Sequence, residues 1–175
     1  MSGVGEGVRV RRAIREDWPR MVELDRELAR FENLPAPTDA EAARLGAMLF
    51  DESRIEALVA ERDGAIEGMA IFWEALGSSF RARTFLFLED LVVAHGARSR
   101  GVGEALMAEL AREGVRRKVQ RIDWFVLDWN EGAMRFYRRL GAAPATDWVR
   151  YSLSQEAMET LAREGPTRSV PPRGL

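Results

Sequence analysis

Two neighbouring carboxylates stand inside an apolar stretch, FLEDLVV, at residues 87–93. Because side chains alternate along a strand, Glu89 and Asp90 should point to opposite faces, and burial raises the pKa of a carboxyl group toward the range of a general base. At least one of them should line a cavity or meet a cation, since an isolated buried charge is unfavourable. The alternative is a strand-end pair neutralised by arginines, such as Arg81, Arg83 or Arg150.

A glycine-containing hexapeptide, RSRGVG at residues 98–103, precedes a helix-forming run. Gly101 and Gly103 leave the backbone open to close approach, and the unpaired N–H groups of a first helical turn attract anions. Arg98 and Arg100 would add charge-assisted hydrogen bonds, which suits a phosphate or a pyrophosphate. An ordinary strand-to-helix loop with solvated arginines explains the hexapeptide alone equally well.

Two kinds of nucleotide-binding loop are excluded by the residues around these glycines. A Walker loop needs a lysine followed by serine or threonine after its second glycine, and this stretch has no such lysine. A dinucleotide-binding loop needs a third glycine where Leu106 stands, although Asp123 lies at a suitable distance downstream. The hexapeptide therefore fits neither nucleotide fold.

A tyrosine stands in a third stretch, WNEGAMRFYRRLGA, at residues 129–142. Asn130 can cap a helix there and Gly141 can end it, with an apolar stripe between them. Tyr137 is then either an aromatic residue at the edge of the core or a proton donor, because a tyrosine pKa of about 10 keeps the phenol protonated at neutral pH.

These residues need a scaffold, and the hydrophobic pattern predicts one. Asp63-Gly64 favours the positive φ angles of a hairpin turn, and Thr38 or Asp39 can cap a helix. In chain order the pattern predicts a strand at 8–13, helices at 16–32 and 39–50, two strands within 54–76, a strand within 80–94, a helix at 101–118, a strand at 121–129, a helix at 130–140 and a last strand near 148–153. This order predicts an α/β (α+β) fold: a mixed, mostly antiparallel central sheet with helices on both faces.

Length and composition limit the number of domains and the classes of partner. A chain of 175 residues with 46% hydrophobic content can bury one good core. We expect a flexible N-terminus at 1–7, one domain at 8–163 and a disordered tail at 164–175. The net charge of -2, with both signs mixed along the chain, gives no support for a nucleic-acid partner.

Residue usage excludes several chemistries. The chain has no cysteine, which removes thiol chemistry, and His95 is its only histidine, which leaves no basis for a catalytic triad or a multi-histidine metal site. No apolar run approaches the roughly 20 residues that span a bilayer, and the N-terminus lacks the apolar stretch of a signal peptide. We therefore expect a cytoplasmic protein with no membrane partner and no metal.

Taken together, these stretches resemble the GNAT superfamily of N-acetyltransferases. The phosphate loop of that family is Arg or Gln, two residues, Gly, any residue, then Gly or Ala, and residues 98–103 match every fixed position. Within the superfamily the chain is most similar to the spermidine/spermine (diamine) group, which includes thialysine acetyltransferases. The likeness covers about residues 8–160 and is carried by ELARFE (27–32), FLEDLVV, the glycine loop and WNEGAMRFYRRLGA.

The resemblance implies an acetyl-CoA-dependent enzyme. The strand before the loop would pair its backbone with the pantetheine arm, and the loop would hold the pyrophosphate. The implied donor-binding residues are Leu91, Val92, Val93, Arg98, Ser99, Arg100, Gly101, Val102, Gly103, Glu104, Asn130 and Ala133. Tyr137 matches the family tyrosine that protonates the departing CoA thiolate, and Glu89 matches the acidic residue that contacts the substrate amine and relays its proton.

The implied reaction sets requirements on these side chains. An ammonium group cannot attack a thioester until a carboxylate or a water chain takes its proton, and Glu89 is the candidate for that role. A strand N–H near Leu91 would stabilise the developing oxyanion. Direct attack on the thioester needs no covalent enzyme intermediate.

The expected acceptor is a primary amine of a small molecule, either a diamine, a polyamine or a lysine-like amino acid. The resemblance implies substrate contacts at Phe31, Glu32, Glu89, Asp123, Trp124 and Phe125. Where polyamine enzymes carry an acidic residue and a tryptophan, this chain has Ser79 and Arg81, with Arg83 close by, so a small amine is expected over spermine. The alternatives are a protein or peptide N-acetyltransferase and a noncatalytic acyl-CoA-binding domain. The resemblance also implies a homodimer.

Overall fold

The structure is a computed structural model and describes residues 7–145 and 149–165. The chain divides into two units, one ending at Met134 and one beginning at Arg135, and their relative position is not determined. The expected flexible ends lie almost entirely outside the described residues, and the single domain at 8–163 stays a prediction.

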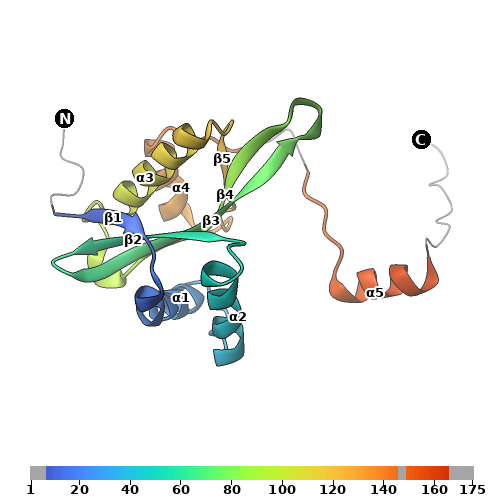
Figure 1. The fold of residues 1–175 in the computed structure, drawn as a ribbon, viewed down its shortest axis with the longest axis horizontal. Coiled ribbons are helices and arrows are strands. Elements are labelled where there is room, and N and C mark those ends of the chain that lie inside the picture. Colours follow the sequence, from blue (N-terminus) through green and yellow to red (C-terminus); the bar gives the residue numbers. More distant parts are fainter. Residues whose placement is uncertain (1–6, 146–148, 166–175) are drawn as a thin grey trace. The chain divides into compact units, whose positions relative to one another are not determined.

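A five-stranded sheet in the order β1-β2-β3-β4-β5 forms the centre of the first unit (Figure 1). The strands are β1 (Arg9–Arg12), β2 (Glu56–Arg62), β3 (Ala65–Ser78), β4 (Arg83–Val93) and β5 (Ile122–Asp123). The first four pair antiparallel, and β5 pairs parallel with β4. Asp63 and Gly64 turn the chain between β2 and β3 with φ angles of 51° and 79°, as their sequence predicts. The expected mixed, mostly antiparallel sheet is confirmed.

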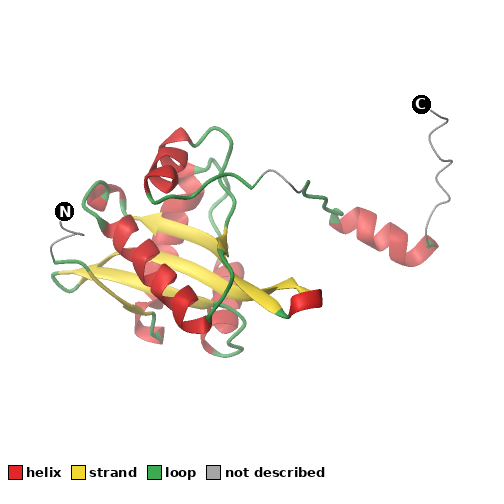
Figure 2. Cartoon of the chain, turned by 90° about the horizontal axis from the view of Figure 1, so that it is seen from above, coloured by secondary structure: helices red, strands yellow, loops and turns green. Residues whose placement is uncertain are grey.

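Helices cover both faces of this sheet (Figure 2). Helices α1 (Trp18–Phe31) and α2 (Asp39–Phe50) lie on one face, and α3 (Val102–Arg117) lies on the other. The core under α1 and α2 is formed by Met21, Leu24, Ile55, Ala57, Val59, Met69, Ile71 and Val92. On the α3 side, Leu86 of β4 faces Gly114 of the helix, and Leu106 and Leu110 are fully buried.

Local signals explain where the helices begin. The Thr38 hydroxyl accepts the N–H of Glu41, and the Glu41 carboxylate accepts the N–H of Thr38, so the first turn of α2 is capped in both directions. Helix α4 (Glu131–Arg139) begins after Asn130. Among the described helices, none is both long and apolar enough to cross a bilayer.

Two expected strands differ from the structure. The strand expected at 121–129 is limited to Ile122–Asp123, and residues 124–127 have no regular structure. The last strand is wrong for residues 149–153, which are irregular, while position 148 lies outside the described residues. Alternating apolar residues do not form a strand without a neighbour that satisfies their backbone groups.

One helix was missed. Helix α5 (Gln155–Glu164) follows Ser154, whose hydroxyl accepts the N–H of Ala157 at 3.2 Å. A serine before QEAMETLARE is the type of N-terminal signal that predicts such a helix.

Candidate functional site

The carboxylate pair lies at a β-bulge in β4. Ile71 of β3 pairs with Asp90 and its neighbour Phe72 pairs with Leu88, so Glu89 is an extra residue with no partner across the ladder. A bulge of this kind reverses the alternation of side chains beyond it. Leu86 faces α3 before the bulge, whereas Val92 joins the core under α1 after it. The regular alternation expected across Glu89 and Asp90 is therefore wrong.

Asp90 is the desolvated carboxyl group of the pair. Glu89 is exposed and Asp90 is half-buried. Burial raises the pKa of Asp90 to about 7, and the charges of Asp25, Glu89 and Glu32 act in the same direction. Burial also raises the pKa of Asp25. Within the first unit no ion pair of Asp90 with Arg81 or Arg83 is found, whereas the position of Arg150, in the second unit, relative to Asp90 is not determined.

We call Asp25, Glu32, Glu89 and Asp90 the acidic cluster. Asp25 lies in α1 and Glu32 ends that helix, whereas Glu89 and Asp90 lie at the bulge of β4. Asp25 and Glu32 are seven positions apart, which places them on one face of a helix. That spacing is the sequence signal that could have identified Asp25, a residue that the sequence reasoning missed.

Beside the bulge, the edge of β4 is open. β5 pairs with β4 only through Ile122 opposite Leu86 and Asp123 opposite Phe87. The chain then leaves the strand conformation, so in the described part of the protein residues 88–93 have no partner on this edge. An unpaired strand edge offers N–H and C=O groups to an extended ligand. Leu91, Val92 and Val93, the residues expected to face pantetheine, lie in this segment.

Aromatic rings flank the open edge. The Phe87 ring lies 4.7 Å from Trp73 and 5.4 Å from Phe125. These contacts involve Phe125, one of the residues expected to contact the acceptor. Asp123, another of them, has its carboxylate bound to Nε of Arg121 at 2.8 Å.

Phe31, the last residue of α1, contacts both a second aromatic ring and an arginine of the glycine loop. The rings of Phe31 and Trp129 are 5.5 Å apart, and the guanidinium of Arg98 lies 5.2 Å from the centre of the Phe31 ring. Phe31 is therefore close to an arginine of the loop and next to Glu32 of the acidic cluster. Sequence reasoning missed Trp129 as a partner of Phe31.

The glycine loop leads directly into α3. Ser99 and Gly101 adopt left-handed conformations with φ of 61° and 81°, and Gly101 is the N-cap of the helix. The N–H of Ala105 donates to the Gly101 carbonyl at 2.9 Å. The N–H groups of residues 102–104 come before this bond, in the first turn, where a helix attracts anions.

Gly68 of β3 allows α3 to approach the sheet at this end. A Cβ atom at Gly68 would lie 2.8 Å from the Val92 carbonyl oxygen and 2.9 Å from Cγ1 of Val102. Val102 is the first residue of α3, so the absence of a side chain at Gly68 sets the position of the helix N-terminus beside β4.

The helix that carries the predicted tyrosine begins as its sequence indicates. The Asn130 side chain accepts the N–H of Ala133 at 3.1 Å, which confirms the expected cap and gives both residues a structural role. Tyr137 stands in the same helix, in the second unit, so its position relative to Asp90 is not determined. Burial raises the pKa of Tyr137 to about 12, and its ring lies 5.1 Å from that of Phe136.

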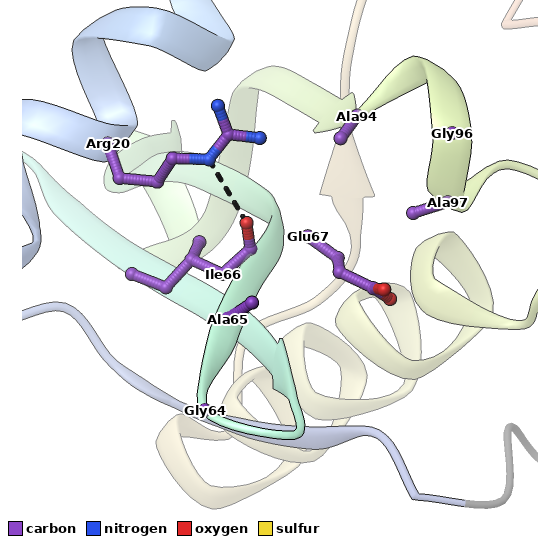
Figure 3. Close-up of a pocket in the computed structure, with 8 residues that line it drawn as sticks. All are labelled: Arg20, Gly64, Ala65, Ile66, Glu67, Ala94, Gly96 and Ala97. Carbon is purple, nitrogen blue, oxygen red and sulfur yellow. Dashed lines mark hydrogen bonds between the residues drawn. The ribbon is translucent and has the colours of Figure 1, made fainter.

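A cavity of about 480 Å³ lies near the glycine loop but away from the open edge (Figure 3). It is lined by Arg20, residues 64–67, and residues 94, 96 and 97. Nε of Arg20 donates to the Ile66 carbonyl at 3.2 Å inside it. Because residues 65–67 belong to β3, this cavity lies on the β3 side of β4 and not on the side of β5.

Comparison with known proteins agrees with the resemblance. Residues 14–142 match the Acetyltransferase (GNAT) family. Thialysine N-epsilon-acetyltransferase of Mus musculus is 28% identical over 166 residues, which covers 88% of this chain and 96% of that enzyme. L-ornithine N5-acetyltransferase NATA1 of Arabidopsis thaliana is 29% identical over 99 residues, which covers 57% of this chain and only 43% of the plant enzyme.

Solved structures show the same fold. An integron cassette protein from the mobile metagenome of V. cholerae superposes with a TM-score of 0.77 at 22% identity, covering 90% of this chain and 98% of its own. A probable acetyltransferase superposes with a TM-score of 0.75 at 19% identity, covering 83% and 97%. Since the family match spans more than half of the chain, the protein belongs to the GNAT family and is an N-acetyltransferase, for which the family implies acetyl-CoA as cosubstrate.

Proposed function

We propose that this protein transfers the acetyl group of acetyl-CoA to a primary amine of a small molecule. The observation that carries the proposal is Asp90, a half-buried carboxyl group with a pKa of about 7 inside the acidic cluster. At neutral pH such a group is ionised in a large fraction of molecules and can take a proton from a bound ammonium group. The surrounding carboxylates attract a cationic acceptor.

The open edge of β4 and the loop that leads into α3 fit the donor. The open edge at Leu91–Val93 would pair with the amide groups of pantetheine, and the first turn of α3, with Arg98 and Arg100, would hold the pyrophosphate. Acetyl-CoA supplies a thioester whose carbonyl carbon is open to attack by nitrogen. The other expected donor contacts, Ser99, Gly101, Val102, Gly103, Glu104, Asn130 and Ala133, remain proposals.

The two carboxylates at the bulge would divide the work on the acceptor. Glu89 is exposed and would contact the incoming amine, whereas Asp90 is shielded from water and would hold the proton that the amine loses. The two residues are neighbours in the chain and the charge of Glu89 acts on Asp90, so we propose that a water molecule carries the proton between them.

Tyr137 is our candidate for protonating the thiolate that leaves. Its pKa of about 12 keeps the phenol protonated at neutral pH, so a proton is present to donate. In this scheme the ammonium group gives one proton to Asp90 before its nitrogen attacks the thioester. Tyr137 gives its proton to the departing thiolate, and the second proton that the nitrogen loses as the C–S bond breaks restores the phenol.

A short acceptor agrees best with the positions of the arginines. Arg81 and Arg83 lie at the turn between β3 and β4, and Arg83 is seven strand residues from Asp90, or roughly 23 Å. A short amine at Asp90 does not meet these charges, while a long polycation extending along β4 is repelled by them. The relatives named for thialysine and L-ornithine support a lysine-like acceptor.

An amine panel tests the proposal. Purified protein with acetyl-CoA should acetylate thialysine, ornithine or a short diamine with a higher kcat/KM than spermine or a lysine-containing peptide. Robust peptide acetylation would favour a protein N-acetyltransferase. CoA binding without turnover of any amine would favour a noncatalytic domain.

We further propose that the chain forms a homodimer, as the resemblance implies. In the second unit, Val149, Tyr151 and Leu153 expose 78%, 92% and 59% of their surfaces. Exposed apolar side chains at alternate positions of a short segment are typical of an interaction surface.

A further inference from the structure

An arginine outside the glycine loop holds its backbone. Arg62 ends β2, and its Nη2 donates to the carbonyl of Arg100 at 2.9 Å. The side chain is only 17% exposed although it carries a full charge. A half-buried arginine at the end of a strand, bonded to a backbone oxygen 38 positions away, is not explained by the sheet itself.

Glu67 supplies the charge that keeps Arg62 there. One carboxylate oxygen of Glu67 lies 3.6 Å from Nε of Arg62, and the other lies 3.7 Å from Nη1 of Arg100. Nε of Arg62 and Oε2 of Glu67 are both buried without a hydrogen bond. In the close-up of the cavity, the Glu67 side chain points away from Arg20 (Figure 3). The hydrogen bond to the loop is therefore the directional contact of Arg62, and Glu67 balances its charge.

The bond fixes one peptide plane of the loop. In a planar trans peptide, the carbonyl of Arg100 and the N–H of Gly101 point in opposite directions. The Arg62 contact turns that carbonyl toward the β2–β3 hairpin, so the Gly101 N–H points away from the hairpin. Ser99 and Gly101, on either side of Arg100, both have positive φ. A non-glycine residue such as Ser99 rarely holds this conformation without support from its surroundings.

We infer that Arg62 is a positioning residue for the donor: by holding the Arg100 carbonyl, it orients the loop N–H groups that bind the pyrophosphate of acetyl-CoA. This inference rests on the proposed donor site. It assigns Arg62 no contact with the acetyl group or with the acceptor, so its effect should be confined to the phosphate-containing part of the donor.

Two ligands, CoA and S-acetylpantetheine, separate this role from a general effect on folding. The variant Arg62→Ala should bind CoA about tenfold more weakly in titration calorimetry, because a charge-assisted hydrogen bond that orders the loop is lost. Binding of S-acetylpantetheine, which lacks the pyrophosphate, should be unchanged in the same calorimetry. Arg62→Lys keeps a charged hydrogen-bond donor, so its affinity for CoA should fall between those of wild type and Arg62→Ala, while its affinity for S-acetylpantetheine should be unchanged. Should Arg62→Ala fail to fold, Arg62→Lys carries the same comparison.

Arg9→Ala is the matched control, because Arg9 lies in the neighbouring strand and forms an exposed ion pair with Glu61, which is next to Arg62. This control should bind CoA and S-acetylpantetheine with wild-type affinity. Unchanged CoA binding in Arg62→Ala, or an equal loss with CoA and S-acetylpantetheine, would overturn the inference. CoA binding is measured without an acceptor, so a wild type that binds CoA but acetylates no amine contradicts the proposed function and still leaves the role of Arg62 decided by the variants.

Discussion

Asp90 and Glu89 are adjacent in the chain but differ in their contact with water. Glu89 is the extra residue of the bulge and is exposed, whereas Asp90 is half-buried and faces the charges of Asp25 and Glu32. The surroundings of Asp90 therefore raise its proton affinity, so that it can hold or release a proton near neutral pH.

The raised pKa of Asp90 has a consequence for stability. The folded protein binds this proton up to a pKa of about 7, while the unfolded chain loses it near the ordinary value of 3.8, so stability falls as the pH rises between these values. Asp90→Asn should remove that loss. We expect a higher Tm than wild type at pH 8 and a difference that shrinks as the pH falls toward 4, measured by thermal unfolding across that range.

Asp25→Asn should change the Tm with the same sign, since burial also raises the pKa of Asp25. A Tm difference for Asp90→Asn that is the same at every pH would mean that Asp90 is not the desolvated group described here.

A second prediction concerns the leaving group. Tyr137→Phe removes only the phenol oxygen and should lower kcat on the order of a hundredfold, because general acid catalysis is lost. CoA binding by calorimetry should stay at the wild-type value. Phe136→Leu, which changes the adjacent ring without removing a proton donor, is the control. Unchanged turnover in Tyr137→Phe would remove Tyr137 from the mechanism.

At the scale of elements, the site depends on the way β4 meets its neighbours. β3 pairs along almost the whole of β4, β5 pairs at two residues only, and α3 begins where Gly68 leaves space for Val102. The limited pairing of β4 with β5 leaves its edge open, and the absence of a side chain at Gly68 allows the N-terminus of α3 to lie beside that edge.

Gly68→Ala tests this arrangement. The added Cβ would lie 2.8 Å from the Val92 carbonyl oxygen and 2.9 Å from Val102, so either β4 or the first turn of α3 must move. Overpacking of this kind costs about 1–3 kcal/mol, and we expect a lower Tm together with weaker CoA binding. Gly96→Ala is the control for stability, because a Cβ there meets nothing within 4 Å. If Gly68→Ala leaves both quantities unchanged, α3 is not held as described.

The elements differed in how far the sequence could predict them. The helix cap at Thr38 or Asp39, the Asp63-Gly64 turn and the cap at Asn130 depend on residues close in the chain, and the structure confirms the turn, the Asn130 cap and, of the first two candidates, Thr38. The bulge depends on the register between β3 and β4, which strand periodicity cannot determine. Identifying Asp90 as the desolvated group required that register, and so did the contact of Arg62 with Arg100, because both join residues distant in sequence.

At the scale of the whole molecule, charge is distributed unevenly although the net charge is only -2. The acidic cluster surrounds Asp90, and Arg98, Arg100 and Arg62 gather at the glycine loop. A cationic acceptor is therefore attracted to the bulge at Asp90, and an anionic donor is attracted to the loop that follows the same end of β4.

The proposed dimer gives a prediction at this scale. Sedimentation of wild type should give twice the mass of the chain, and Tyr151→Asp with Leu153→Asp should shift it to the mass of one chain by placing charges on an apolar surface. Met158→Asp, at a more distant exposed apolar position of α5, serves for comparison. A wild type that sediments as a single chain at every concentration contradicts the dimer and leaves the proposed chemistry unaffected.

The pH dependence of kcat/KM for the best acceptor of the panel, compared between wild type and Asp90→Asn, tests the central claim most directly. For wild type we predict a rise through pH 7, where Asp90 ionises. Asp90→Asn should lose that inflection and fall on the order of a hundredfold at neutral pH, because the proton acceptor is gone. A variant with the wild-type profile and the wild-type rate would contradict the assignment of Asp90 as the group that takes the proton of the amine.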